Sequence, residues 1–324
     1  MYRVYRPKAF TDIIGQQHIV RTLQNQISSG TIAHAYLFCG TRGTGKTSVA
    51  KIFARAVNSH LSKGGVAAGG FELDIFEIDA ASNNSVTDVR ELIDKVKYPP
   101  VSAKYKVYII DEVHMFSGSA FNAFLKTLEE PPSHVIFILC TTEPYKLLPT
   151  VQSRCLRFDF RSATNAETEK LLEKVFVSEK ITADKDAIKL LASAGAGSFR
   201  DALSYAETAI AYCGKNKITA SDVAQILGTV DKAVLKALLD AIVAADTAKT
   251  DTICTDIFSR GINPTALVKD FLEIIRTTFI EKKNQTLLDT YKTFAELEMS
   301  IKTATDAAAI FAGACFVSAG SGAV

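Results

Sequence analysis

The chain has 324 residues, of which 48% are hydrophobic and 22% are charged, and this composition excludes a disordered chain. A formal net charge of +2 argues against a wholly basic nucleic-acid binder. The positive charge is nevertheless concentrated, because residues 1–60 contain eight Lys or Arg and a single acid, Asp12. A local positive field of this kind suits polyanions such as nucleotide or nucleic-acid phosphate. The length suggests two or three domains.

The opening segment 1–8 is charged and interrupted by a proline, so it does not read as a signal peptide. No apolar run reaches the roughly 20 residues that a membrane-spanning helix needs. The run that comes nearest, residues 307–317, is rich in Ala and Gly and is expected to pack on other helices. The six cysteines lie far apart without a Cys-x-x-Cys pair, so we expect free thiols in a reducing cytoplasm.

Short apolar runs alternate with amphipathic segments over the first half of the chain. The runs predict strands at residues 35–39, 73–78, 107–110, 135–140 and 156–160. Helical segments separate these runs, among them residues 118–130, which Ser117 would cap and Pro131 would end. Apolar strands with helical crossovers predict an α/β fold in which helices flank a five-stranded parallel sheet.

After about residue 161 the strand pattern stops. Helices are expected at residues 165–178, 184–194 and 199–212, followed by one that begins at a capping box from Thr219 to Asp222. Residues 231–320 are again helical in pattern, and Gly228 is a plausible boundary. The predicted organisation is an α/β domain over 1–161, a small helical domain over 162–228 and an all-α domain over 229–324.

A phosphate-binding motif follows the first predicted strand. Residues 40–47 read Gly-Thr-Arg-Gly-Thr-Gly-Lys-Thr and fit G-x-x-x-x-G-K-[ST], in which backbone N–H groups curl around a phosphate. An ordinary glycine turn before a helix is the alternative, but the preceding strand and the amphipathic segment 48–57 favour the motif. The predicted nucleotide-binding residues are Gly40, Thr41, Arg42, Gly43, Thr44, Gly45, Lys46, Thr47 and Ser48.

Two adjacent acids, Asp111 and Glu112, end the third predicted strand. Beside a phosphate loop such a pair favours hydrolysis, so we assign Asp111 with Thr47 to Mg²⁺ and Glu112 to activation of the attacking water. The alternative is a strand-end acid that caps the next helix. His114 is expected to hydrogen-bond locally or to pack, without a catalytic role.

Three further polar positions stand close to predicted element ends. Thr142 closes the fourth strand, Arg154 precedes the fifth, and Arg200 begins a helix. A hydroxyl at residue 142 would orient water near a terminal phosphate. From composition alone both arginines are ordinary surface residues.

These motifs together resemble the AAA+ clamp-loader ATPases, most closely the bacterial DnaX (gamma/tau) family of DNA polymerase III. The matching segments lie between residues 2 and 212, and they include Tyr-Arg-Pro at 5–7, the phosphate loop, Asp-Glu-Val-His-Met at 111–115, Leu-Glu-Glu-Pro-Pro at 128–132, Ser-Arg-Cys at 153–155 and Gly-Ser-Phe-Arg-Asp-Ala-Leu-Ser at 197–204. The helical region beyond Gly228 matches only in character and position.

The resemblance implies roles for residues that composition leaves open. Arg154 would be an arginine finger acting on the nucleotide of a neighbouring subunit, Arg200 a second sensor of the chain's own nucleotide, and Thr142 the first sensor. Residues expected to flank the adenine are Tyr5, Arg6, Pro7, Ile13 and Ile14. The middle helical domain would be a lid, and the C-terminal domain an oligomerisation collar.

The implied activity is that of an ATP-driven motor that opens a sliding clamp and loads it on primer–template DNA for replication. Its expected cofactors are ATP and Mg²⁺. Its expected partners are delta- and delta-prime-type subunits, further copies of itself, the clamp and the DNA backbone, with no membrane. The helix expected over 84–97 carries Thr87, Arg90 and Lys97, candidates for phosphate contacts, although a solvated charged face explains them equally well.

The sequence departs from this family at one module. A four-cysteine zinc site is usual after the phosphate-loop helix, whereas here Ser59 stands at the first cysteine position and a glycine-rich stretch at 64–70 replaces the others. Without thiolates that site cannot form, so we predict no zinc. The chain ends at Val324, so contacts made by the longer tail of tau-type proteins are not expected.

Two other functions compete with the motor. One is a non-hydrolysing clamp-loader subunit with a structural role, against which the intact Lys46, Thr47, Asp111 and Glu112 speak. The other is a different AAA+ DNA enzyme, such as a branch-migration helicase, which would carry a winged-helix-like C-terminal domain in place of a plain helical bundle.

Overall fold

The computed structural model describes residues 1–2, 4–61, 70–214, 216–230, 232–301 and 304–320. The chain divides into two compact units, one formed by residues 1–180 with 191–207 and the other by 181–190 with 208–324. The domain boundaries at residues 161 and 228 stay predictions. Among the residues described, no helix combines the length and the apolar character needed to cross a membrane.

The first unit is built on a five-stranded sheet with strand order β2-β3-β4-β1-β5, in which every neighbouring pair is parallel. This confirms the predicted sheet. The strands are β1 (Ala35–Cys39), β2 (Ile75–Asp79), β3 (Lys106–Asp111), β4 (Val135–Thr141) and β5 (Leu156–Asp159). The three inner strands are buried at almost every residue, whereas the edge strands β2 and β5 are partly exposed.

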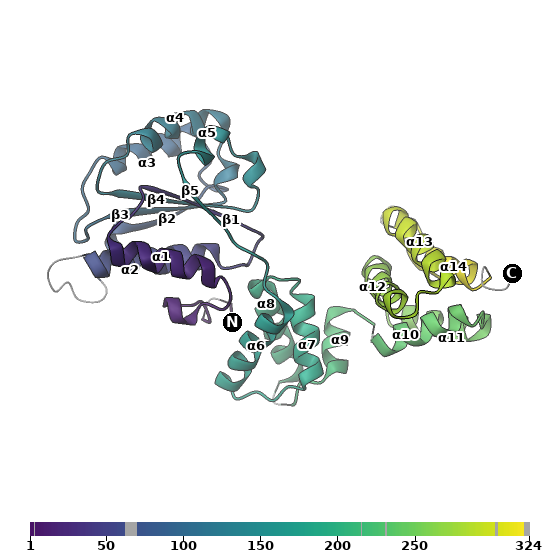
Figure 1. The fold of residues 1–324 in the computed structure, drawn as a ribbon. Coiled ribbons are helices and arrows are strands. Elements are labelled where there is room, and N and C mark those ends of the chain that lie inside the picture. Colours follow the sequence, from purple (N-terminus) through teal and green to yellow (C-terminus); the bar gives the residue numbers. More distant parts are fainter. Residues whose placement is uncertain (3, 62–69, 215, 231, 302–303, 321–324) are drawn as a thin grey trace. The chain divides into compact units, whose positions relative to one another are not determined.

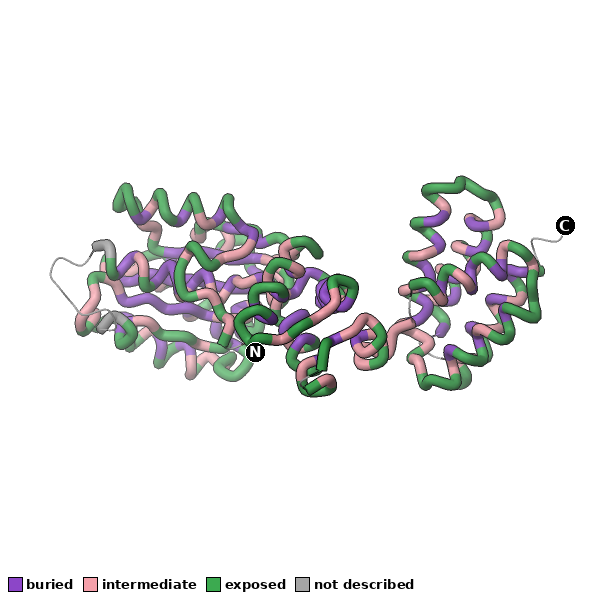
Figure 2. Tube along the Cα trace, turned by 90° about the horizontal axis from the view of Figure 1, so that it is seen from below, coloured by how far each residue is buried: buried purple, intermediate pink, exposed green. Residues whose placement is uncertain are grey.

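Helices cover both faces of the sheet (Figure 1). One layer contains α1 (Gln17–Ser29) and α2 (Lys46–Leu61), and the other contains α3 (Val86–Val96), α4 (Gly118–Glu129) and α5 (Pro149–Gln152). Alternate strand residues enter opposite cores, so that Phe38 packs in the α1/α2 layer and Leu37 in the α3/α4 layer. Buried positions accordingly follow the strands and the inner sides of these helices (Figure 2).

The edge strand β2 begins two residues later than its apolar pattern predicts. Gly70–Asp74 form the 3-10 helix η2, and Leu73 is left 68% exposed. The Asp74 carboxylate accepts the backbone N–H groups of Val101, Ser102 and Ala103 at 2.7, 2.8 and 2.8 Å, which fixes the chain before the strand. Burial alone would raise the pKa of Asp74, but these hydrogen bonds outweigh it and the pKa is lowered.

Capping residues set the helix ends in the first unit. Ser85 and Asp88 form a capping box, so α3 starts at Val86 rather than at residue 84 as predicted, and it ends at Val96. Ser117 caps α4 as predicted, with its hydroxyl accepting the N–H of Ala120. The short helices η1 (Phe10–Asp12), η3 (Val113–Met115) and η4 (Pro144–Lys146) connect these elements.

The predicted all-helical second half is confirmed. The helices are α6 (Asn165–Ser178), α7 (Lys185–Ala194), α8 (Phe199–Cys213), α9 (Ala220–Leu227), α10 (Lys232–Val243), α11 (Thr247–Ser259), α12 (Pro264–Lys282), α13 (Gln285–Ser300) and α14 (Ala307–Gly320). The Thr219–Asp222 capping box starts α9. In the second unit, Phe271, Phe294 and Phe311 are fully buried at the centre of the α10–α14 core.

The cysteines are free thiols, as predicted. Cys39 and Cys140 lie at strand ends with 2% and 0% exposure, and burial raises the pKa of both. They therefore pack as small apolar groups rather than as nucleophiles.

Candidate active site

The phosphate loop joins β1 to α2, and its glycines have the backbone that the motif requires. Gly43 and Gly45 have φ angles of 77° and 98°, which side chains other than glycine adopt only with strain. α2 begins directly at Lys46, so its first N–H groups and the positive end of the helix dipole face the loop. The fold thus presents a concentration of backbone donors to an anion.

Lys46 lies at the base of this loop and is only 6% exposed. Its ammonium donates to the carbonyl oxygens of Gly40 and Thr41 at 2.8 and 2.9 Å. Burial lowers the pKa of Lys46, because the charged form loses hydration there. Among the described residues, the hydrogen bonds of this buried ammonium go to carbonyl oxygens, so phosphate oxygens fit it as charged partners.

The loop is seated against the first turn of α8. The Gly43 carbonyl accepts the N–H of Phe199 at 3.1 Å, and a Cβ at residue 43 would lie 1.9 Å from the Ser198 hydroxyl oxygen. The glycine is therefore required by close approach as well as by φ.

A cavity of about 440 Å³ opens over the loop. Most of the residues predicted to bind nucleotide or Mg²⁺ or to act in catalysis line it, namely Tyr5, Arg6, Pro7, Ile13, Ile14, Arg42, Gly43, Thr44, Gly45, Lys46, Thr47, Ser48, Asp111, Glu112 and Arg200. Of the residues predicted to act on a nucleotide, four lie outside its lining: Gly40, Thr41, Thr142 and Arg154. The structure thus brings the N-terminal segment, the phosphate loop, the acid pair and α8 together around one space.

Sequence reasoning missed several residues of the lining, including Tyr2, Glu77, Asp79, Leu171 and Leu203. Helical spacing could have found Leu203, because it lies three residues after Arg200 and shares its face of α8. Glu77 and Asp79 lie on the edge strand β2, in the segment 77–83, which resembles the family but gives neither carboxylate a role.

The Thr47 hydroxyl donates to the Asp111 carboxylate at 2.8 Å, although the two residues are 64 positions apart in sequence. Such a hydroxyl–carboxylate pair suits Mg²⁺, which is commonly held by one or two carboxylates, by water and by the phosphates of the substrate. The described residues contain no group of three or more His, Cys, Asp or Glu side chains able to hold a metal by themselves. A magnesium ion at this position would therefore depend on a nucleotide for its remaining ligands.

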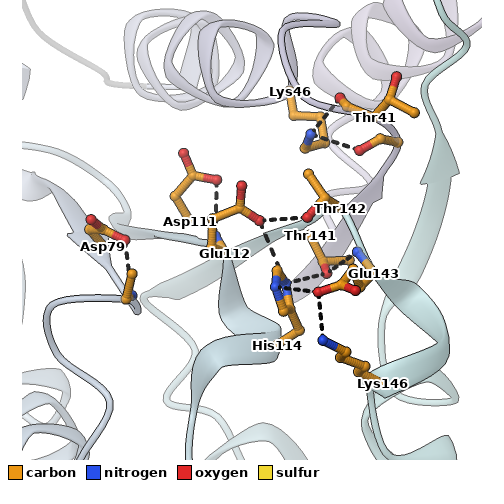
Figure 3. Close-up of polar contacts among 12 residues, drawn as sticks. Thr41, Lys46, Asp79, Asp111, Glu112, His114, Thr141, Thr142, Glu143 and Lys146 are labelled. Atoms are coloured by element: carbon orange, nitrogen blue, oxygen red, sulfur yellow. Dashed lines mark hydrogen bonds and ion pairs between the residues drawn. The ribbon is translucent and has the colours of Figure 1, made fainter. Parts of the chain in front are cut away.

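Glu112 follows β3 with a φ of 48°, a left-handed conformation that is costly for a residue with a side chain. Its N–H donates to the Asp111 carboxylate at 3.0 Å. The Thr142 hydroxyl donates to Glu112 Oε2 at 3.0 Å, and His114 lies beside the same oxygen (Figure 3). Thr142 thus contacts the predicted water-activating acid rather than the cavity.

His114 forms hydrogen bonds at the end of the neighbouring strand β4 rather than within its own segment, where the sequence predicts them. Its Nδ1 lies 3.0 Å from Thr141 Oγ1 and its Nε2 lies 3.0 Å from Glu143 Oε2. The side chain is 6% exposed, so these contacts are shielded from water.

Arg154 lies far from the cavity of its own chain. It precedes β5, whereas the phosphate loop follows β1, and the pairing of Tyr36 with Leu156 shows that the two strands run parallel. The start of β5 at Leu156 is therefore level with Tyr36, four residues and about 13 Å of strand before Gly40, and Arg154 lies in the turn that precedes this start. The guanidinium donates to the Thr150 carbonyl at 2.8 Å and to Glu129 at 2.6 Å.

Arg200 lies inside the cavity lining, with its guanidinium 4.9 Å from the centre of the Tyr2 ring. The N-terminal segment is held near this position by the Tyr5 hydroxyl, which donates to Glu179 at 2.6 Å. The predicted adenine-flanking segment and the predicted second sensor therefore lie side by side in the lining of the cavity.

The three candidate DNA-contacting residues, Thr87, Arg90 and Lys97, are exposed on α3 or at its end. The Lys97 ammonium pairs with Asp94 at 2.7 Å, so a phosphate would have to compete with this carboxylate. The prediction that zinc is absent concerns Ser59 on α2 and the stretch 64–70, of which residues 64–69 lie outside the described residues.

Three family models match successive parts of the chain. They are described as "DNA polymerase III, delta subunit" over residues 15–164, "DNA polymerase III clamp loader subunit, ATPase lid domain" over 167–215, and "DNA polymerase III subunits gamma and tau domain III" over 218–307.

Relatives that match most of the chain are also named as DNA polymerase III subunits. The DNA polymerase III subunit gamma of Buchnera aphidicola is 37% identical over 286 residues, which are 84% of this chain and 78% of that protein. The chain belongs to the gamma/tau family of DNA polymerase III clamp-loader subunits. Gamma/tau relatives also include the tau subunits of Bacillus subtilis, 42% identical over 87% of this chain and 52% of that protein, and of Escherichia coli, 41% identical over 84% and 44%. This gamma/tau chain thus spans about half the length of the tau relatives it matches.

A solved structure shares the fold. The RuvB Holliday junction branch migration motor of Thermotoga maritima aligns with a TM-score of 0.57 over 75% of this chain and 80% of that one, at 16% identity. At this level of identity, the comparison shows a shared fold and nothing more.

Proposed function

We propose that the chain is an ATP-hydrolysing motor subunit of a replicative clamp loader, which opens the sliding clamp and loads it on primer–template DNA. The observation that carries the proposal is the buried Lys46 ammonium at the base of a cavity that also contains the Thr47–Asp111 pair. Membership of the gamma/tau family supports the biological setting.

Each polar group around the cavity then has a role in phosphoryl transfer. Lys46 and the N–H groups of the loop bind the β- and γ-phosphates, and Thr47 and Asp111 hold Mg²⁺, which when bound neutralises phosphate charge. Glu112 accepts a proton from the attacking water. Thr142 orients that acid as the first sensor, and Arg200 contacts the chain's own nucleotide as the second.

Arg154 serves a neighbouring subunit in this proposal. Its position at the opposite end of the sheet from the phosphate loop supports action in trans, because its own γ-phosphate site is out of reach. A guanidinium supplied by a neighbour stabilises transition-state charge by a factor of about 10³–10⁵ in rate. A single copy should therefore hydrolyse ATP slowly.

The proposed partners are delta- and delta-prime-type subunits, copies of the same chain, the sliding clamp and primer–template DNA held through its backbone by Thr87, Arg90 and Lys97. The proposal also includes a cytoplasmic location and the absence of bound zinc. The predicted lid (162–228) and collar (229–324) would supply nucleotide closure and oligomerisation.

The test is the ATPase rate of the full chain reconstituted with partner subunits, with and without clamp and primed DNA. Lys46→Ala should abolish nucleotide binding and hydrolysis. The matched control is Arg55→Ala, in the same helix, which removes a cation that pairs with Glu72 outside the cavity lining, and it should keep both. Arg154→Ala should lower hydrolysis in the complex by about 10³-fold or more at unchanged nucleotide affinity. Arg157→Ala, which removes an exposed arginine of β5, is its control.

The two competing functions make different predictions in this assay. If the chain were a non-hydrolysing structural subunit, complexes that contain the Lys46→Ala variant would still load clamps normally. A branch-migration motor would show no synergy between clamp and primed DNA, and the match of residues 218–307 to a gamma and tau domain speaks against it.

A further inference from the structure

A buried histidine connects the predicted water-activating acid to a second carboxylate. His114 lies on η3, after β3, and its Nδ1 is 3.5 Å from Glu112 Oε2. On its other edge, Nε2 lies 3.0 Å from Glu143 Oε2. Glu143 directly follows Thr142 at the end of β4, so the imidazole bridges the carboxyl ends of two neighbouring strands (Figure 3).

The Glu143 carboxylate is itself held in place from the solvent side. The Lys146 ammonium donates to Glu143 Oε2 at 2.8 Å, and the Tyr145 hydroxyl donates to Oε1. These two hydrogen bonds lower the pKa of Glu143, so this carboxyl group is ionised at neutral pH. An ionised carboxylate only accepts hydrogen bonds, and His114 Nε2 therefore carries a proton and donates it to Glu143.

Anchoring at Nε2 fixes the orientation of the whole ring. The opposite edge then hydrogen-bonds Thr141 Oγ1 at 3.0 Å and packs against Glu112 Oε2 at 3.5 Å, where the ring restricts the space open to that oxygen. The Thr141 hydroxyl oxygen also accepts the N–H of Glu143 at 3.0 Å, which closes the cluster on the backbone of β4. Since His114 is 6% exposed and Thr141 is fully buried, the ring has little freedom to turn.

We propose that His114 is a positioning residue for ATP hydrolysis, which with Thr142 confines one carboxylate oxygen of Glu112 and is anchored for this purpose by Glu143. The inference rests on the proposed function, because it assumes that Glu112 acts on water. The confined oxygen leaves the second one for the attacking water in the cavity that Glu112 lines. A histidine that only fills space would not need a carboxylate partner that Lys146 and Tyr145 in turn hold in place.

The test uses the full chain in the reconstituted clamp-loader complex. His114→Leu removes both polar edges, and it should lower kcat by about ten- to a hundred-fold, the range found when supporting partners of metal-site residues are lost. The KM for ATP and the affinity for a non-hydrolysable ATP analogue should stay unchanged. His114→Asn restores a polar group where Nδ1 lies and should recover part of the lost kcat.

A double-mutant cycle examines the anchor. Glu143→Ala should lower kcat in the same direction, and the double variant with His114→Leu should be no worse than His114→Leu alone, because the two residues act as one unit. His134→Leu is the matched control, since it removes a partly buried histidine that contacts the Val96 carbonyl outside this cluster. Its kcat should equal that of the unmodified chain.

The outcomes separate this inference from the proposed function. Hydrolysis that survives in Lys46→Ala would overturn both. Loss of hydrolysis in Lys46→Ala with normal kcat in His114→Leu overturns the inference alone, as does a strictly additive cycle. If His114→Leu does not fold, His114→Asn and Glu143→Ala decide the question, and unchanged kcat in Glu143→Ala rejects the anchor.

Discussion

The substitution Gly43→Ala tests the close contact between the phosphate loop and the start of α8. Alanine at a φ of 77° costs about 1–2 kcal/mol in backbone strain. Its Cβ would also lie 1.9 Å from Ser198 Oγ and 2.9 Å from Ser198 Cβ, so the serine must move. The Ser198 hydroxyl accepts the N–H of Asp201 at 3.2 Å as the cap of α8, and its loss costs about 1 kcal/mol. The expected destabilisation is about 2–3 kcal/mol.

The assay is urea unfolding of the full chain without nucleotide, together with titration of a fluorescent ATP analogue. Gly43→Ala should lower the midpoint of the transition of the first unit and weaken nucleotide binding. The double variant Gly43→Ala/Ser198→Gly should recover the part that comes from overlap, since glycine is tolerated at a cap at a cost of a few tenths of a kcal/mol. Ser198→Gly alone is the control. Equal stability of Gly43→Ala and the unmodified chain would refute this reasoning, and so would a double variant no better than the single one.

Three other substitutions examine separate parts of the molecule. The pKa of Asp74 is lowered in the folded chain, so the stability that its carboxylate contributes is present above the unfolded pKa of about 4 and is lost as the pH falls through the folded pKa. Asp74→Asn should therefore lower the urea midpoint at pH 7 and make the free energy of unfolding depend less on pH in the acid range. Glu129→Gln frees the Arg154 guanidinium from an exposed ion pair worth at most about 1 kcal/mol, so hydrolysis by the complex should rise by no more than about five-fold, whereas Glu130→Gln should change nothing. Phe294→Ala should destabilise the C-terminal unit by about 3–5 kcal/mol in thermal unfolding, and a shift near zero would contradict the assigned core.

The sequence was sufficient where a local pattern and the fold agree. The runs that end at Cys39 and at Cys140 became buried central strands because both of their faces are apolar. The start of β2 could not be predicted, because Leu73 continues the apolar run and only the distant N–H groups of residues 101–103 turn the chain at Asp74.

The candidate site likewise has a part that the sequence predicts and a part that it does not. The phosphate loop and Asp111 carry spacing that can be read directly, and the structure brings them together through Thr47. The partners of His114 could not be predicted from the sequence, because Glu143 is 29 residues away and becomes a neighbour only through the adjacency of β3 and β4. The role of Arg154 also depended on family resemblance, since nothing in its local sequence separates it from a surface arginine.

The parallel pairing of β1 with β5 has a consequence for any assembly built from this chain. If Arg154 reaches the nucleotide of a neighbouring copy, as proposed, contacts between copies would be head-to-tail, because the phosphate loop and Arg154 lie at opposite ends of the sheet, and a head-to-tail series either closes into a ring or stays open. In an open series the two terminal copies are unequal, because one displays an arginine that no nucleotide meets and the other holds a nucleotide that no arginine reaches. A terminal position is thus suited to a protein that supplies a finger without hydrolysing ATP itself.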